Sequence, residues 1–157
     1  MMLLYRLVRL IETHSQALAA SLLLRVQESD HTREYRNVPS EELRNRVYEI
    51  YHHLGEWLMG KTEFDIEKRY REIGAQRAQQ GVPFSQVAMA IMLTKENLWD
   101  FLRKESTIDR PVEVFGELEM LQLLERFFDH AIFYAALGYE RAIAAGVPET
   151  ASAGKAV

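Results

Sequence analysis

Histidine is the residue type in this chain whose spacing is most easily tested for metal chemistry. There are five: His14, His31, His52, His53 and His130. A helical zinc site pairs two histidines four residues apart with a carboxylate, and no pair here has that spacing. The adjacent His52 and His53 would point about 100° apart on a helix, so they do not readily share one ion. We therefore expect structural or surface histidines and no metal site.

Haem requires less of the sequence, because one axial histidine facing an apolar pocket is enough to hold it. On a helical chain His53 is the first candidate and His130 the second. Nothing in the sequence positions a second, distal group. We expect no cofactor and a colourless protein. A haem or small-molecule carrier is the alternative hypothesis.

Nucleophilic catalysis needs a nucleophile, a base and an orienting group that converge. The serines at positions 15, 21, 40, 85 and 106 are explained by helix caps or surface positions, and no glycine-rich phosphate loop is present. There is no cysteine, which excludes disulfides, thiolate metal sites and cysteine nucleophiles. We predict no catalytic residues and no enzyme. An enzyme with its site in an unmarked helical cavity is a third alternative.

Large aromatic and methionine side chains offer a different kind of site. Methionine packs adaptably and often lines tolerant binding surfaces. These side chains either fill the core or line a pocket for a small apolar ligand between helices. The candidate pocket residues are Trp57, Tyr70, Met89, Met92, Trp99 and Phe128.

Composition and charge restrict the partners of the protein. The 157 residues are 48% hydrophobic and 27% charged, which is ordinary for one globular domain. The net charge is −4, and lysine and arginine are scattered, which argues against nucleic acid. The apolar residues 1–24 are interrupted by Arg6, Arg9 and Glu12, so we predict an amphipathic helix rather than a membrane span. We expect a cytoplasmic protein.

The elements that position these side chains are predicted to be helices. Apolar residues recur at steps of three and four almost throughout, and no alternating segment suggests a strand. Ser40 is predicted to cap a helix, and Gly60 and Gly81 are predicted to end helices. We predict an all-α domain over residues 1–146 with a flexible tail, 147–157. Its five long helices should span about 2–29, 40–60, 62–81, 84–102 and 112–145.

Several short motifs lie between residues 40 and 101. They are the Glu42-Leu43-Arg44 triplet, the run 53–58, Tyr70 with Ile73-Gly74, the run 77–85 and the run 98–101. In these motifs the chain resembles the N-terminal sensor domain of RsbR-type (RsbRD) stressosome proteins and related sensor histidine kinases. The resemblance implies a globin-like helical bundle that has lost haem, usually dimeric, and acting as a signal-input module.

Together these observations predict a non-enzymatic regulatory domain that relays a signal through dimerisation and helix packing. Family members usually continue into an output domain, so we expect a stand-alone copy or a fragment whose output comes from a STAS-type or kinase-type partner. The apolar runs 1–4 and 22–24 predict a homodimer through the first and last helices. The fourth helix is apolar on most sides and should be central, with Trp99 mostly buried against the last helix.

Overall fold

The computed structural model describes residues 2–105 and 111–146, and the side chains of residues 2–5, 111–117 and 120 are outside this description. The predicted tail 147–157 also lies outside the described residues. Within them the chain is helical almost throughout and contains no strand, which confirms the all-α prediction. No described helix has the length and apolar character needed to cross a membrane.

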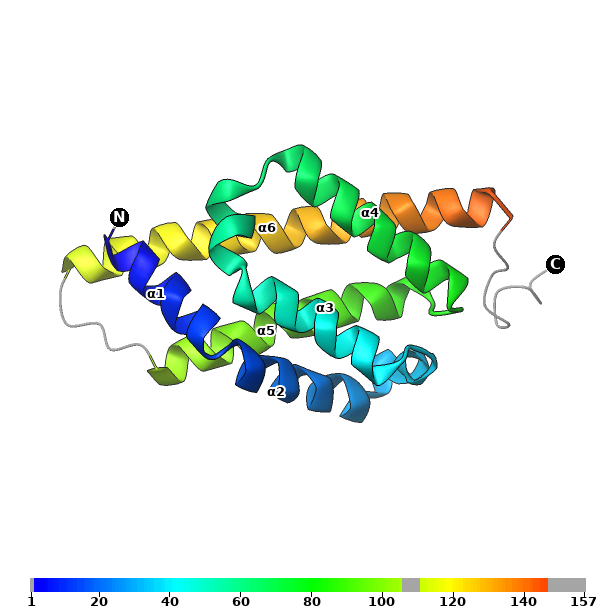
Figure 1. Cartoon of the computed structure of the whole chain (residues 1–157), viewed down its shortest axis with the longest axis horizontal. Helices are drawn as coiled ribbons and strands as arrows, with labels where there is room; N and C mark the ends of the chain where they lie inside the picture. The colour runs from blue at the N-terminus through cyan, green and yellow to red at the C-terminus, as the bar shows by residue number, and fades with distance from the viewer. Residues whose placement is uncertain (1, 106–110, 147–157) are drawn as a thin grey trace.

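In the part of the chain that the structure describes, eight helical elements follow one another (Figure 1). Six are α-helices, η1 is a 3₁₀ helix and η2 is a single π-helical turn. Their bounds are α1 Met2–Thr13, α2 Ser15–Glu28, η1 Asp30–Asn37, α3 Ser40–His52, η2 Glu56–Gly60, α4 Glu63–Gln79, α5 Phe84–Glu105 and α6 Pro111–Ala144.

Two of the predicted long helices are interrupted. The first breaks at His14, whose ring nitrogen Nδ1 lies 2.9 Å from the carbonyl oxygen of Leu10. The second breaks after His52, and the Glu12 carboxylate accepts a hydrogen bond from the freed backbone N–H of Gly55 at 2.9 Å. A polar side chain that competes for backbone groups favours such breaks. Hydrophobic spacing alone does not report this competition.

The predicted helix ends are mostly confirmed. Thr62 caps α4 in a reciprocal capping box with Asp65. Gly81 has φ of +75°, a conformation that favours glycine, at the turn between α4 and α5. Pro111 is the first residue of α6. The Ser40 cap was wrong, because Pro39 occupies the cap position of α3 and no side chain caps that end.

The closest helix pair is α4 with α6, which cross at backbone contact. A Cβ built on Gly74 of α4 would lie 2.0 Å from the carbonyl oxygen of Ala135 in α6. A Cβ on Gly138 of α6 would lie 2.1 Å from the carbonyl oxygen of Arg71 in α4. Each helix therefore contributes one glycine to the crossing, and α4 crosses α6 along much of its length (Figure 1).

The helix α5 contacts α2, α4, α6 and η1, so its predicted central position is confirmed. It is not enclosed on all sides, because Met92 is 40% exposed. A buried polar network fixes it to its neighbours. The Tyr51 hydroxyl of α3 donates to the carbonyl oxygen of Thr94 at 2.8 Å, and the Asn97 amide donates to the carbonyl oxygen of Leu18 in α2 at 3.0 Å.

Candidate functional site

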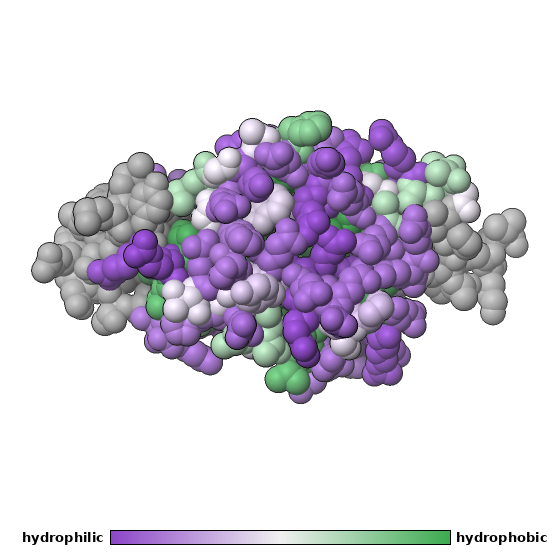
Figure 2. Space-filling view, in the orientation of Figure 1, coloured by the Kyte–Doolittle hydropathy of each residue, from purple (hydrophilic) through white to green (hydrophobic). Residues whose placement is uncertain are grey.

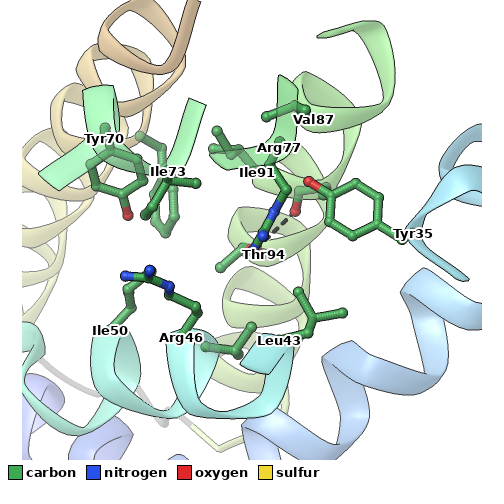
Figure 3. A pocket seen from close by; sticks show the side chains of 13 residues that line it. Tyr35, Leu43, Arg46, Ile50, Tyr70, Ile73, Arg77, Val87, Ile91 and Thr94 are labelled. Atoms are coloured by element: carbon green, nitrogen blue, oxygen red, sulfur yellow. Dashed lines mark hydrogen bonds between the residues drawn. The ribbon is translucent and has the colours of Figure 1, made fainter. Parts of the chain in front are cut away.

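A small cavity lies between α3, α4, α5, α6 and η1 (Figure 3). Its volume is about 60 Å³. Most of its wall is aliphatic or aromatic, and its polar groups come from two arginines, two tyrosines and one threonine. The lining residues are Tyr35, Leu43, Arg46, Val47, Ile50, Tyr70, Ile73, Arg77, Val87, Ala90, Ile91, Thr94 and Phe128.

Arg77 of α4 is the most unusual residue of this wall, because it is only 2% exposed. Its Nη1 donates to Oε1 of Glu42 at 2.9 Å and to Oε1 of Gln80 at 2.7 Å. The guanidinium carbon lies 5.7 Å from the ring centre of Tyr35, and Nε has no hydrogen-bond partner. A buried charge is costly unless it is paired, so Glu42 is the group that makes this position tolerable.

The local sequence holds Arg77 in place from both sides. Gln80, three residues further along, also donates to Glu42, at 3.2 Å to Oε2. The backbone N–H of Val82 donates to the carbonyl oxygen of Arg77 at 3.1 Å, across the left-handed Gly81. The run 77–85 therefore does more than turn the chain, because it also fixes a buried cation.

Tyr70 lies on the same face of α4, two helical turns before Arg77, and is only 3% exposed. Its ring packs edge-on against Phe127 at 5.8 Å between ring centres. Among the described residues its hydroxyl has no hydrogen-bond partner. In Figure 3 the hydroxyl oxygen points toward the guanidinium of Arg46. Burial raises the pKa of Tyr70, so the hydroxyl keeps its proton and acts as a donor.

Arg46 of α3 completes the polar part of the wall. Its Nη2 donates to Oε1 of the neutral Gln76 at 2.8 Å, and it forms no ion pair with the described carboxylates. Its neighbour Arg69 is paired with Glu49. Partial burial, followed by the positive charges of Arg69 and Arg77, lowers the pKa of Arg46, while the carboxylates of Glu42 and Glu49 act in the opposite direction. Of the two arginines that line the cavity, Arg77 is therefore paired with a carboxylate, and Arg46 is hydrogen-bonded to an amide.

The ligand pocket stays a prediction, and the structure places its six predicted residues in different parts of the fold. Tyr70 and Phe128 line the cavity. Trp57 is buried but lies elsewhere, 6.1 Å from the ring centre of Phe127. Met92 is exposed, and Met89 is half-buried outside the cavity.

Trp99 contacts the last helix as predicted, since its Nε1 donates to Oε1 of Glu125 at 3.2 Å. The indole is only half-buried, and it lines a surface groove with Glu96, Asp100 and Arg103 rather than the cavity. The expectation that it is mostly enclosed was too strong. The indole N–H is satisfied by a carboxylate at the edge of the α5–α6 interface, which keeps the ring near solvent.

Sequence reasoning missed the polar residues of the cavity. Arg77 falls on the apolar face of α4 that Ile66, Tyr70 and Ile73 define. A charged residue at such a position was the available signal, because it must be buried with a partner. Arg46 and Tyr35 carry no comparable signal, since their positions depend on how α3 and η1 pack.

The two haem candidates lie at the surface. The Nδ1 atom of His53 is 3.7 Å from the Glu56 carboxylate, and its side chain is 46% exposed. His130 is bonded to the Glu63 carboxylate on the outside of α4. Neither faces the cavity. Within residues 2–105 and 111–146, no three histidine, aspartate or glutamate side chains are grouped so as to hold a metal ion.

These features define a helical module with a small, mostly apolar cavity whose wall includes two arginines. The family model for the RsbT co-antagonist protein rsbRD N-terminal domain matches residues 16–151 of the chain. The chain therefore belongs to this family of regulatory sensor-type domains, which confirms the resemblance in the motifs. No curated protein and no solved structure gives a significant match.

Proposed function

We propose that this protein is a non-enzymatic sensor domain in which the state of the cavity is relayed through the helices around it. One observation carries the proposal: the cavity is walled by both members of the closest helix pair. Tyr70, Ile73 and Arg77 come from α4, and Phe128 comes from α6. A ligand can shift a helix arrangement only through contacts that differ between two states. A ligand in this cavity would contact both α4 and α6, so its contacts would change if the two helices moved relative to each other.

The cavity limits the size of the signal. Sites for drug-sized ligands usually have volumes of about 300–1,000 Å³, whereas this cavity has about 60 Å³. A small apolar ligand, as the sequence suggested, would meet mostly aliphatic walls but also two arginines. A haem-sized carrier function has no support from this volume.

We further propose that the output is a change in a homodimer formed through the first and last helices. On α6, Leu118 is 50% and Phe133 59% exposed, about four helical turns apart. Exposed apolar side chains on one helix favour an interaction surface. The contribution of 22–24 is smaller than the sequence suggested, because Leu22 and Leu23 are buried in the core and only Leu24 is exposed.

The face of the molecule in Figure 2 is mainly hydrophilic, with hydrophobic residues in separate small patches. In the same orientation α4 crosses in front of α6 (Figure 1). A dimer through α6 would therefore leave much of this hydrophilic face free. A cytoplasmic partner of STAS or kinase type would then read the arrangement of the dimer.

Light scattering tests the dimer directly. We expect twice the 18.2 kDa chain mass at micromolar concentration. Phe133→Glu should give the monomer mass, because it places a charge in the interface. Met92→Glu, at an exposed apolar position on α5, is the matched control and should leave the dimer intact. A wild-type monomer at high micromolar concentration would reject this part of the proposal.

A further inference from the structure

The polar groups of the cavity lack an acceptor. The Tyr70 hydroxyl, in a residue 3% exposed, has no hydrogen-bond partner among the described residues. The Nε–H of Arg77, in a residue 2% exposed, also has none. Buried donors are nearly always paired in native proteins. Among the described residues the lining of the cavity contains no carboxylate, so a negatively charged acceptor for these donors would have to come from a ligand.

The charge around the cavity also lacks a counterion. Arg77 is paired with Glu42 at 2.9 Å, and Arg69 with Glu49. Within the described part of the chain, Arg46 donates a hydrogen bond to the neutral Gln76 and forms no ion pair, although the charges of Glu42 and Glu49 act on it from a distance. Arg46 and Tyr70 both line the cavity, and in Figure 3 the hydroxyl of Tyr70 points toward the guanidinium of Arg46. An arginine with a neutral partner and a hydroxyl without a partner are two donors that a carboxylate could accept hydrogen bonds from.

The volume and the walls restrict the anion. One water needs at least about 10–15 Å³ of such space, so a cavity of about 60 Å³ holds on the order of four non-hydrogen atoms. Apart from the hydroxyls of Tyr35 and Thr94, the remaining wall is apolar and includes Ile50, Ile91 and Phe128. A tetrahedral oxyanion would turn oxygens toward these side chains without donors. A planar carboxylate with a short alkyl group matches both parts of the wall, because its oxygens can face the donors and its alkyl group can face the apolar side chains.

We infer that the cavity is a binding site for a small monocarboxylate of the size of acetate or propionate, whose oxygens accept hydrogen bonds from Tyr70 and Arg46 while its alkyl group packs against the apolar wall. Arg77, which also lines the cavity, contributes positive charge. This inference rests on the proposed function only in taking the bound carboxylate as the sensed signal. For a ligand this small we expect a dissociation constant on the order of 0.1–10 mM.

The test is a titration of the full chain with sodium acetate and sodium propionate at constant ionic strength, followed by backbone amide NMR shifts. We expect saturable shifts at residues around the cavity. Acetamide, a neutral molecule of the same size, should give none. Hexanoate should bind more weakly than propionate, because the cavity is too short for it. Absence of saturation for both short carboxylates, or equal binding of acetamide, would overturn the inference.

Two variants test the assigned groups. Tyr70→Phe removes only the hydroxyl and keeps the ring against Phe127, and Arg46→Gln removes the charge at a half-buried position. Each should weaken propionate binding at least tenfold. Tyr48→Phe and Arg44→Gln, on α3 outside the cavity wall, are the matched controls and should bind as wild type. Unchanged binding by both cavity variants would overturn the site.

The same samples separate this inference from the proposed function. Light scattering and amide hydrogen exchange of α6 are measured with and without saturating propionate. Saturable binding with no change in mass or exchange would leave the carboxylate site standing and reject the sensor mechanism. No saturable binding in the titration, together with an intact dimer, would reject the carboxylate site and leave the sensor mechanism standing.

Discussion

Replacement of Gly74 by alanine tests how far the α4–α6 crossing determines the fold. The added Cβ would lie 2.0 Å from the carbonyl oxygen of Ala135, 2.8 Å from its carbonyl carbon and 3.0 Å from its Cα. Favourable contacts between non-bonded heavy atoms begin near roughly 3.5 Å. All three neighbours are backbone atoms of α6, so no side-chain rotation relieves the overlap. The two helices must move apart by on the order of 1 Å.

The expected cost follows from two opposing terms. Extra atoms in a packed interior usually destabilise by about 1–3 kcal/mol, and sometimes more. Alanine in a helix interior is better than glycine by up to about 1 kcal/mol. Because backbone must move against backbone, the upper end of the first range applies. We therefore expect Gly74→Ala to lower the free energy of unfolding by about 2–3 kcal/mol.

Denaturant unfolding followed by circular dichroism measures this change, provided the slope with denaturant stays constant. Gly60→Ala is the matched control. The nearest atom to a Cβ there is Cβ of Glu56 at 4.0 Å, so that variant should stay within about 0.5 kcal/mol of wild type. If Gly74→Ala were equally mild, the tight crossing of α4 and α6 would be wrong, and so would the coupling proposed through it.

Three further predictions concern other parts of the chain. Trp57→Ala should cost about 3–5 kcal/mol in denaturant unfolding because Trp57 is buried, whereas the half-buried Trp99→Ala should cost less than about 2 kcal/mol; the reverse order would contradict the packing described. Hydrogen bonds from Arg25 and Arg103 hold the pKa of the Asp100 carboxyl below its ordinary value of 3.8. The ionised carboxylate therefore stabilises the fold above pH 3.8, and this stabilisation is lost as the pH falls through the lower pKa of the folded state. Acid unfolding of Asp100→Asn should therefore show a smaller loss of stability below about pH 4 than wild type, and identical pH profiles would refute the ion pair. Hemin titration should give no one-to-one spectral endpoint, since His53 faces solvent; a sharp endpoint abolished by His53→Ala would contradict this.

The sequence predicted those parts of the fold that depend on local chemistry. Thr62 caps the start of α4, and Gly81 forms the turn after α4. The spacing of apolar residues at three and four predicts where the helices lie in the sequence. A glycine inside a helix, such as Gly74 in the motif Ile73-Gly74, is consistent with a close neighbour, and the structure places Ala135 there. The breaks at His14 and after His52 were missed, because they involve contacts that hydrophobic spacing does not report: the His14 ring with the carbonyl oxygen of Leu10, and the Glu12 carboxylate with the backbone N–H of Gly55.

The candidate site was predicted less well, for a physical reason. A search for large apolar side chains found Tyr70 and Phe128 but also the exposed Met92. The charged groups of the cavity are Arg46 and Arg77, which come from α3 and α4. The sequence of either helix alone does not predict how the two helices pack against each other. Whether an arginine is buried depends on the partner that reaches it, here Glu42 for Arg77. A globin-like arrangement and the dimer stay predictions.

The crossing of α4 with α6 also has a consequence for how the chain folds during synthesis. Gly74 and Ala135 are about sixty residues apart, and α6 is the last described helix to be made. At about 5–20 residues per second, the apolar face of α4 waits roughly 3–12 s for its partner. During that interval Tyr70 and Ile73 have no cover from α6, and Arg77 already depends on Glu42 from α3. A nascent chain paused between α5 and α6 would be the form most prone to aggregation.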